Sequence, residues 1–359
     1  MKHKLKLYAR ELYARILFHS GLHALVDRLA PRRLVILAGH CVAPDGGGWG
    51  GAEHLPADMV ISEPKLRALL TWFAPRYRVV TIGAGLAELE RAGQARGLVA
   101  FSFDDGYRDN HAVLLPLLRE SGTTATIFLE SRPLDRREVS WSHKLFWLLA
   151  RMPLADFVQA YGRHAGDDRS YILANQVVTE GRDPRPAYQV KRFLKYEGDP
   201  ALRDRAVDAV FAEQGGDERA LCEALYMSWD EARELRDAGL ELGGHTVNHP
   251  VLSRLSAPEQ RREVVDGAAA LRRELRQDVP TFAYPWGRRW DFDAASREAV
   301  SAAGFRSAVT MHAGANLPSS DRLALKRVAI DDQARLHLLV AEACGGFELL
   351  RRFGVDLSE

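Results

Sequence analysis

Cysteine is scarce in this sequence, and the few cysteines are far apart. Only Cys41, Cys222 and Cys344 occur in 359 residues, an odd number with no CxxC spacing. A fold held together by a disulfide framework is therefore excluded. We interpret the three side chains as reduced thiols. Reduced thiols predict a cytoplasmic location. The basic N-terminal segment described below adds the inner surface of the membrane as a second expectation.

Long apolar runs and an excess of one charge are also missing. No stretch approaches the roughly 20 apolar residues that span a membrane, and the N-terminus shows no secretory signal pattern. Lys plus Arg (49) nearly balance Asp plus Glu (48), so nucleic acid is not an expected partner. Hydrophobic residues make up 47% of the chain, which suffices for one large core or two modest ones.

Two adjacent carboxylates follow a short apolar segment near residue 100. Residues 99–103 predict a buried strand, and Asp104, Asp105 and Gly106 come directly after it. The carboxyl ends of strands in α/β sheets are where chemistry takes place. Two neighbouring carboxylates repel each other unless a metal or another cation compensates, so this pair requires a partner.

A pair of histidines far along the chain offers that partner. His245 and His249 follow a second predicted strand, residues 240–244. If the segment were a helical turn, the i, i+4 spacing would place both imidazoles on one face, close enough to share an ion. Two histidines and one aspartate leave positions open for water, which is typical of a catalytic metal site.

Three motifs in this order resemble a known family. Phe103-Asp104-Asp105-Gly106, His245-Thr246-Val247-Asn248-His249 and Phe282-Ala283-Tyr284-Pro285-Trp286-Gly287 are similar to the three main motifs of the NodB-type polysaccharide deacetylases, carbohydrate esterase family four. The resemblance covers roughly residues 34–330 and is interrupted by one insertion.

The resemblance implies a division of roles among these side chains. Asp105, His245 and His249 are expected to bind a divalent metal, with zinc as first choice and cobalt, nickel or manganese as alternatives. Asp104 is expected to be the general base. The implied reaction removes an acetyl group from an N-acetylated amino sugar in a polysaccharide or its precursor.

Two other functions remain open. One is a related amide hydrolysis, either deformylation of an amino-sugar lipid or opening of a cyclic amide. The other is a degenerate barrel that only binds carbohydrate, against which the intact Asp104, Asp105, His245 and His249 argue. A capping Asp-Asp-Gly turn with two surface histidines is the non-catalytic interpretation of the same residues.

The third motif and one further histidine complete the expected site. In the family, the backbone N–H after the motif's proline stabilises the oxyanion, and here that N–H belongs to Trp286. Substrate contacts are expected from Tyr107, Pro285, Trp286 and His40. For His40, which follows the first predicted strand, a purely structural role is the alternative.

The sequence departs from the family pattern at two positions. The arginine that braces the catalytic aspartate is replaced by Ala283, and Arg327 is our first choice for the missing cation, ahead of Arg288 and Arg289. The late histidine that acts as general acid is also not obvious. His312 is the best candidate and His337 the second, and a plain surface histidine is the alternative for both.

Alternating strand and helix patterns predict an α/β fold. We expect an irregular (β/α) barrel of about seven or eight strands over residues 34–335, with a helical insertion at about 131–227 and a C-terminal helix at 336–359. The predicted strands are residues 34–38, 79–82, 99–103, 125–129, 240–244, 281–284, 307–310 and 325–330. Predicted helices between them include 87–95, 113–120, 229–238 with Ser228 as N-cap, 258–276, and 294–303 ending at Gly304.

The first 33 residues are basic and amphipathic. Leu5, Tyr8, Leu12 and Ile16 recur at helical spacing, and eight Lys or Arg residues stand against only Glu11 and Asp27. One interpretation is a helix lying on an anionic membrane surface. The other is a helix docked on the body of the enzyme with a solvated basic face. The pattern alone does not decide between them.

Overall fold

The computed structural model describes residues 2–45, 52–91, 97–181, 183–355 and 357. It divides the chain into two compact units. Unit 1 consists of Met1–Gly47, Ala57–Ser131 and Tyr226–Glu359, and unit 2 of Gly48–Pro56 and Arg132–Leu225. The predicted strands and all the predicted site residues belong to unit 1.

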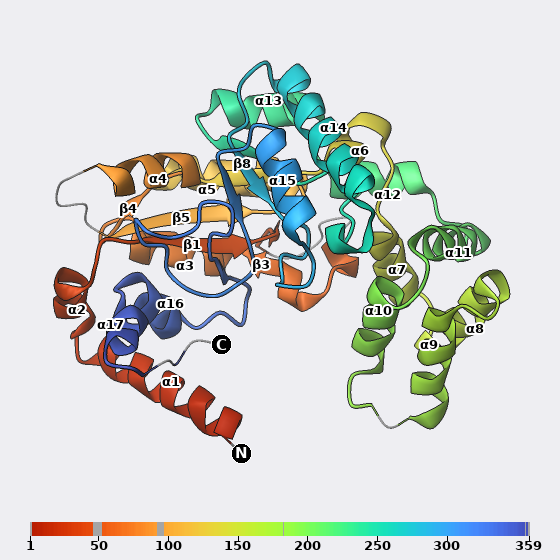
Figure 1. Cartoon of the computed structure of the whole chain (residues 1–359), viewed down its shortest axis with the longest axis horizontal. Coiled ribbons are helices and arrows are strands. Elements are labelled where there is room, and N and C mark those ends of the chain that lie inside the picture. Colours follow the sequence, from red (N-terminus) through yellow and green to blue (C-terminus); the bar gives the residue numbers. More distant parts are fainter. Residues whose placement is uncertain (1, 46–51, 92–96, 182, 356, 358–359) are drawn as a thin grey trace. The chain divides into compact units, whose positions relative to one another are not determined.

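The core of unit 1 is a parallel sheet (Figure 1). Its strands pair in the order β10-β1-β5-β6-β7-β8-β9, and β4 pairs with the first half of β5. The strands are β1 (Leu34–Gly39), β4 (Arg78–Val79), β5 (Leu98–Phe103), β6 (Thr126–Leu129), β7 (Glu241–Gly244), β8 (Thr281–Ala283), β9 (Ser307–Val309) and β10 (Val328–Ala329). A small separate sheet pairs β2 (Cys41–Ala43) with β3 (Val60–Ser62).

The two longest strands, β1 and β5, bring the first motif into position. Every residue of both strands is buried, as expected for continuous apolar runs in a parallel sheet covered on both faces. Their register runs from Leu34 opposite Leu98 to Gly39 opposite Phe103. Both strands therefore end at the same edge, and the backbone N–H of Asp104 donates to the carbonyl of Gly39 at 3.1 Å.

The sheet curls until its two ends meet. Leu325 bridges Val309 of β9 in parallel, and three residues later Val328 pairs with Leu37 of β1. The short segment between Leu325 and Val328 thus joins the last strand to the first. The prediction of an irregular α/β barrel is confirmed.

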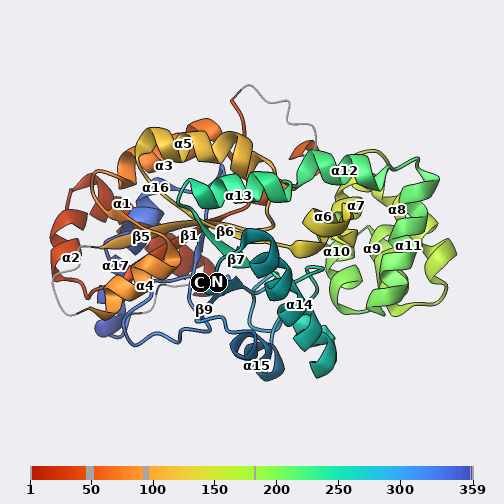
Figure 2. The same ribbon diagram turned by 90° about the horizontal axis from the view of Figure 1, so that it is seen from above.

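Helices of unit 1 surround this sheet (Figure 2). They are α3 (Glu63–Phe73), α4 (Ile82–Glu90), α5 (Leu115–Ser121), α13 (Trp229–Asp237), α14 (Ala257–Leu275) and α15 (Ala294–Ala302). A π-helical turn, Asn110–Leu114, leads into α5. The capping box predicted at Ser228 and Glu231 is present at the start of α13.

Two predicted strands are too long. Of residues 325–330, only Val328–Ala329 form a strand, β10. Residues 79–82 were expected to be extended, but β4 ends at Val79 and α4 already begins at Ile82. The Thr81 side chain caps the helix by accepting from the N–H of Ala84 at 3.3 Å. Residues 92–96, the end of the helix predicted over 87–95, lie outside the described residues.

The two ends of the chain pack against each other within unit 1. The N-terminal segment forms α1 (Lys2–His19) and α2 (His23–Leu29). The C-terminal segment forms α16 (Leu336–Ala343) and α17 (Gly346–Arg352), separated by Gly345 at φ +74°, where one helix was predicted over 336–359. Helix α1 packs on α16, and α2 packs on both α16 and α17 (Figure 1).

Unit 2 is helical. Its helices are α6 (Ser131–Arg136, whose first residue belongs to unit 1), α7 (Trp141–Leu149), α8 (Leu154–Ala165), α9 (Arg169–Glu180), α10 (Pro186–Tyr196), α11 (Pro200–Glu213) and α12 (Glu218–Leu225). Helix α11 packs on α7 and α8, and α9 packs on α8 and α10. None of the helices in the described residues is long and apolar enough to cross a membrane.

Candidate functional site

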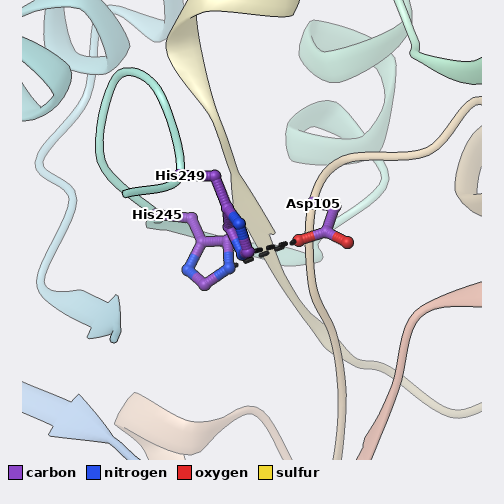
Figure 3. Close-up of side chains that lie close together, drawn as sticks. All are labelled: Asp105, His245 and His249. Atoms are coloured by element: carbon purple, nitrogen blue, oxygen red, sulfur yellow. Dashed lines mark ion pairs between the residues drawn. The ribbon is translucent and has the colours of Figure 1, made fainter. Parts of the chain in front are cut away.

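Three side chains from two motifs meet at the carboxyl edge of the sheet. Oδ1 of Asp105 lies 3.3 Å from Nε2 of His245 and 3.6 Å from Nε2 of His249 (Figure 3). One ligand atom from each residue lies within 4.8 Å of the others. Asp105, His245 and His249 therefore form a candidate metal site.

The order of the strands explains this meeting. Residue 105 follows β5, residue 245 follows β7, and β6 lies between them. Leu129, the last residue of β6, pairs with Gly244 and its carbonyl accepts from the N–H of His245 at 3.0 Å. Parallel strands in register end at one edge, so residues 140 positions apart in the sequence become neighbours.

The backbone around the site is strained. Asp105, Thr246, His249 and Trp286 all have positive φ, between +53° and +73°. Residues other than glycine rarely adopt this conformation, and for a β-branched residue such as Thr246 it is a true outlier. Such conformations cost about 1–3 kcal/mol each and concentrate at functional sites.

The backbone conformation that brings the two histidines together differs from the predicted helical turn. Residues 245–250 form a bend and not a helical turn, so the helical prediction is wrong. The left-handed residues Thr246 and His249 turn the chain back on itself, and the N–H of His249 donates to Oγ1 of Thr246 at 3.0 Å. The imidazole rings come within 4.9 Å of each other, centroid to centroid.

Helix α14 holds this bend in place. The carboxylate of Glu263 accepts from the backbone N–H groups of Val247 and Asn248, at 3.1 and 2.9 Å. A Cβ at Gly267 would stand 3.0 Å from the backbone carbon of Thr246, so only glycine lets the helix approach this closely. Sequence reasoning missed both residues, because nothing local links positions 263 and 267 to the bend.

The donor set fits a divalent cation. Oδ1 of Asp105 is buried and, among the described residues, has no hydrogen-bond donor aligned with it. Burial would raise the pKa of this carboxyl, but the adjacent imidazoles of His245 and His249 hold it well below its usual range. Nδ1 of His245 lies 2.7 Å from the carbonyl of Ala283, which orients the ring with Nε2 toward Asp105.

Asp104 points to a different partner, Arg327. Its two oxygens lie 2.7 Å from Nη1 and Nη2 of Arg327, and Nε of Arg327 donates to the carbonyl of Thr310 at 3.0 Å. Both side chains of the pair are buried. Burial disfavours the carboxylate, but the Arg327 charge outweighs it and lowers the pKa of Asp104.

Arg327 therefore stands where the sequence reasoning expected a substitute for the missing family arginine. Ala283 occupies the usual position, and Arg327 reaches the same carboxylate from the segment that closes the barrel. The other two candidates, Arg288 and Arg289, are exposed and lie over the ring of Trp290.

Tyr107 and His40 both lie beside the aspartates. Tyr107 is completely buried and stacks on Tyr226 with ring centroids 5.5 Å apart. Burial and the neighbouring Asp105, to which the hydroxyl is hydrogen-bonded, raise the pKa of Tyr107 well above its usual value. His40 is half-buried and lies close enough to influence the pKa of both Asp104 and Asp105.

The third motif forms a tight turn beside the histidines. The ring of Trp286 lies 4.9 Å from that of His249, and Pro285 is buried. Gly287 has φ +68°, and its N–H donates to the carbonyl of Pro285 at 2.7 Å. The Trp286 ring therefore packs against a residue of the candidate metal site.

The two candidates for the general acid lie in different surroundings. The ring of His312 lies 6.4 Å from that of Phe292, and burial, with the nearby charges of Lys326 and Arg289, lowers its pKa. The structure pairs His337 with Glu11 of α1, Nε2 to Oε1 at 2.7 Å. His337 thus takes part in the packing of the two chain ends.

The role of a buried polar pair in the residues after β5, Asp109 and Asn110, was also missed by sequence reasoning. Oδ1 of Asp109 accepts from the N–H of Val42 at 2.8 Å and from Nδ2 of Asn110 at 2.7 Å. Nδ2 of Asn110 also donates to the carbonyl of His40 at 3.0 Å. These contacts tie the residues after β1 to those after β5. The only signal was the polar run that follows Gly106.

Comparison with known proteins agrees with this geometry. A family model described as "Polysaccharide deacetylase" matches residues 197–308. No curated protein sequence matches significantly.

Several solved structures have the same fold as this chain, and their sequence identity to it is low. A similarity at this level of identity shows only that the fold is shared. The Streptococcus pyogenes deacetylase PplD in complex with acetate is 16% identical, with a TM-score of 0.55, over 87% of this chain and 99% of that chain. A de-N-acetylase from Aggregatibacter actinomycetemcomitans is 16% identical (TM-score 0.54; 86% and 98%), and IcaB from Ammonifex degensii is 18% identical (TM-score 0.52; 88% and 98%). The family model over residues 197–308, the three ordered motifs and the shared fold together make this chain similar to the polysaccharide deacetylases.

Proposed function

We propose that this protein is a metal-dependent hydrolase that removes the acetyl group from an N-acetylated amino sugar in a polysaccharide or its precursor. The observation that carries the proposal is the buried Asp105, His245 and His249 cluster with Asp104 beside it, held ionised by Arg327. The names of two similar structures, a deacetylase in complex with acetate and a de-N-acetylase, support an acetyl substrate.

The residues of the chain divide the work as follows. Asp105, His245 and His249 would hold the cation, for which zinc is our first choice given two imidazoles and one carboxylate. Such an ion polarises an acyl carbonyl and lowers the pKa of water. Asp104 takes the proton from the attacking water, and Arg327 keeps Asp104 available as an anion for that purpose.

The remaining steps are assigned to Trp286, His312 and His40. The backbone N–H of Trp286, in the left-handed turn after Pro285, stabilises the oxyanion of the tetrahedral intermediate. His312 is assigned to protonate the leaving amine, and the lowered pKa makes its protonated form a stronger proton donor. His40 contacts the substrate from the end of β1.

Acetate release tests the proposal. Purified protein is incubated with acetylated amino-sugar oligomers, with formylated and cyclic-amide analogues beside them, with and without a chelator. We expect acetate release that a chelator abolishes and added metal restores. Release only from the formylated or cyclic substrates would move the function to the related amide hydrolysis, and no release from any substrate, together with glycan binding, would favour a binding barrel.

A further inference from the structure

An exposed apolar surface near the N-terminus is not used by the fold. Of the 13 large hydrophobic side chains that are exposed among the described residues, eight lie on or between α1 and α2. They are Leu5, Leu7, Tyr8, Leu12, Ile16, Leu22, Leu25 and Leu29. We call the four at helical spacing on α1, namely Leu5, Tyr8, Leu12 and Ile16, the outer stripe.

The outer stripe is not the face by which α1 docks. Ala14 and Leu17 are buried against Phe347 and the residues around Cys344, and Arg10 is buried beside the same phenylalanine ring. Successive residues of a helix are rotated by about 100°, so Leu12 and Ala14 project from nearly opposite sides. The docking of α1 is therefore complete, and the outer stripe is an additional surface.

The exposure of this stripe is large. Leu5 and Tyr8 are 69% and 68% exposed, and Ile16 is 54% exposed. Single exposed hydrophobic residues are ordinary, but a continuous row of them marks a surface that meets an apolar environment. Phe353, just after α17, is also 76% exposed.

The charges around the stripe specify the environment. Residues 1–33 contain eight Lys or Arg and two acidic residues. Both acidic side chains already have partners: Glu11 lies against Arg15, Arg335 and His337, and Asp27 lies against Arg33. Arg28 on α2 is exposed. Arg10 and Arg33 are buried, so the positive surplus of the described surface comes from Arg28 and from Arg15 and Arg335, which share the single carboxylate of Glu11.

We infer that α1 binds the headgroup region of an anionic membrane through the outer stripe. An amphipathic helix with an apolar stripe and basic flanks lies in the plane of such a surface, where tyrosine is also favoured. A second copy of the chain is the less suitable occupant, because it would bring two positively charged surfaces together. This inference is independent of the proposed hydrolysis.

Vesicle flotation of the full-length protein tests the inference. We expect the protein to float with vesicles containing phosphatidylglycerol and not with pure phosphatidylcholine, and salt should weaken the binding. The double variant Leu12→Asp with Ile16→Asp should bind at least about tenfold more weakly, since it replaces two inserted apolar side chains with charges. Both positions are exposed, so circular dichroism and the melting temperature should not change.

A matched control is available in unit 2. Ile172 on α9 is 45% exposed, and Ile172→Asp makes the same chemical change as Ile16→Asp on another helix. This variant should bind vesicles as the wild type does. The inference is overturned if the wild type does not bind anionic vesicles, if Ile172→Asp weakens binding equally, or if light scattering shows a dimer that the double variant converts to monomer.

Discussion

Asp104 and Asp105 are adjacent in the sequence and face different partners. Asp104 is held by the two Nη atoms of Arg327, and Asp105 lies against the imidazoles of His245 and His249. Side chains of successive residues point in opposite directions in an extended chain, and the left-handed conformation of Asp105 adds a sharp turn between them. This division implies that the same substitution has different consequences at the two positions.

Replacing each aspartate by asparagine separates the two roles. Asp104→Asn should keep its metal but lose activity by about 10²- to 10⁴-fold, because an amide cannot accept the proton from water. Asp105→Asn should lose metal affinity, because a neutral amide oxygen is a poorer ligand, and excess metal should restore part of its activity. Metal content after gel filtration is measured beside acetate release. The opposite pattern would show that the two assignments are exchanged.

The buried pair of Asp104 and Arg327 makes a second prediction at this scale. Arg327→Met leaves an uncompensated buried carboxylate, so the free energy of unfolding should fall by about 3–5 kcal/mol. Arg327→Lys keeps the charge but cannot make two parallel hydrogen bonds, and it should fall between the wild type and Arg327→Met. Urea denaturation provides the free energies.

A variant that changes both Asp104 and Arg327 is the control for this pair. Asp104→Asn combined with Arg327→Met removes both buried charges, so much of the lost stability should return while activity stays absent. If the double variant were as unstable as the sum of the two single variants, the two side chains would not be energetically coupled.

At the scale of single elements, the sequence predicts helix ends well where the signals are local. The capping box of Ser228 and Glu231 and the left-handed Gly304 after α15 were both predicted and both occur. The start of α4 was missed because its N-terminal N–H groups bond to distant residues, Gly83 to Glu241 at 2.8 Å and Ile82 to Thr126 at 3.0 Å.

Helix α14 allows the role of its glycine to be tested. Alanine is favoured over glycine inside a helix by about 1 kcal/mol, so Gly267→Ala should stabilise the protein if the packing were loose. The new Cβ would instead meet the backbone of Thr246 at 3.0 to 3.4 Å and displace the bend that carries both histidines. We expect metal affinity about tenfold lower or more, measured by titration of the metal-free protein. Unchanged affinity with a higher melting temperature would contradict this.

Helix α16 carries a buried acid that should make stability depend on pH. Burial raises the pKa of Glu342 to about 7, although Arg351 and Arg10 oppose the shift. The folded state favours the protonated form, so its contribution is complete below about pH 4.5 and is lost as the pH rises toward 7. Relative to the wild type, Glu342→Gln should gain up to about 3 kcal/mol between these pH values. Parallel urea-denaturation curves across this range would contradict the assignment.

At the scale of the whole molecule, the chemical needs of the side chains predicted more of the site than the expected backbone conformations did. The need of Asp104 for a cation pointed to Arg327, and the structure places it there. The segment that brings Arg327 to Asp104 could not be predicted from the sequence. Arg327 lies between the residues that pair with β9 and with β1, and this closure of the barrel depends on the curvature of the entire sheet. The bend at His245 was missed for a related reason, since Glu263 and Gly267 impose it from another element.

Metal binding should stabilise unit 1 alone, because all three proposed ligands belong to it. A ligand that binds only the folded state adds about 2.7 kcal/mol at a concentration 100 times its dissociation constant. Added zinc should therefore raise the melting temperature of the metal-free protein. Asp105→Asn should need a higher zinc concentration for the same increase, while Asp104→Asn should respond as the wild type does.

Hydrogen exchange can locate this stabilisation within the chain. Metal should slow exchange at the amides of residues 104–107, 244–249 and 284–287, which carry the site and the strained backbone. The amides of α8 to α11 should exchange at unchanged rates, since these helices have their own packing within unit 2. Equal slowing in both units would mean that the ion acts on the cooperative unfolding of the whole chain and not on a site confined to unit 1.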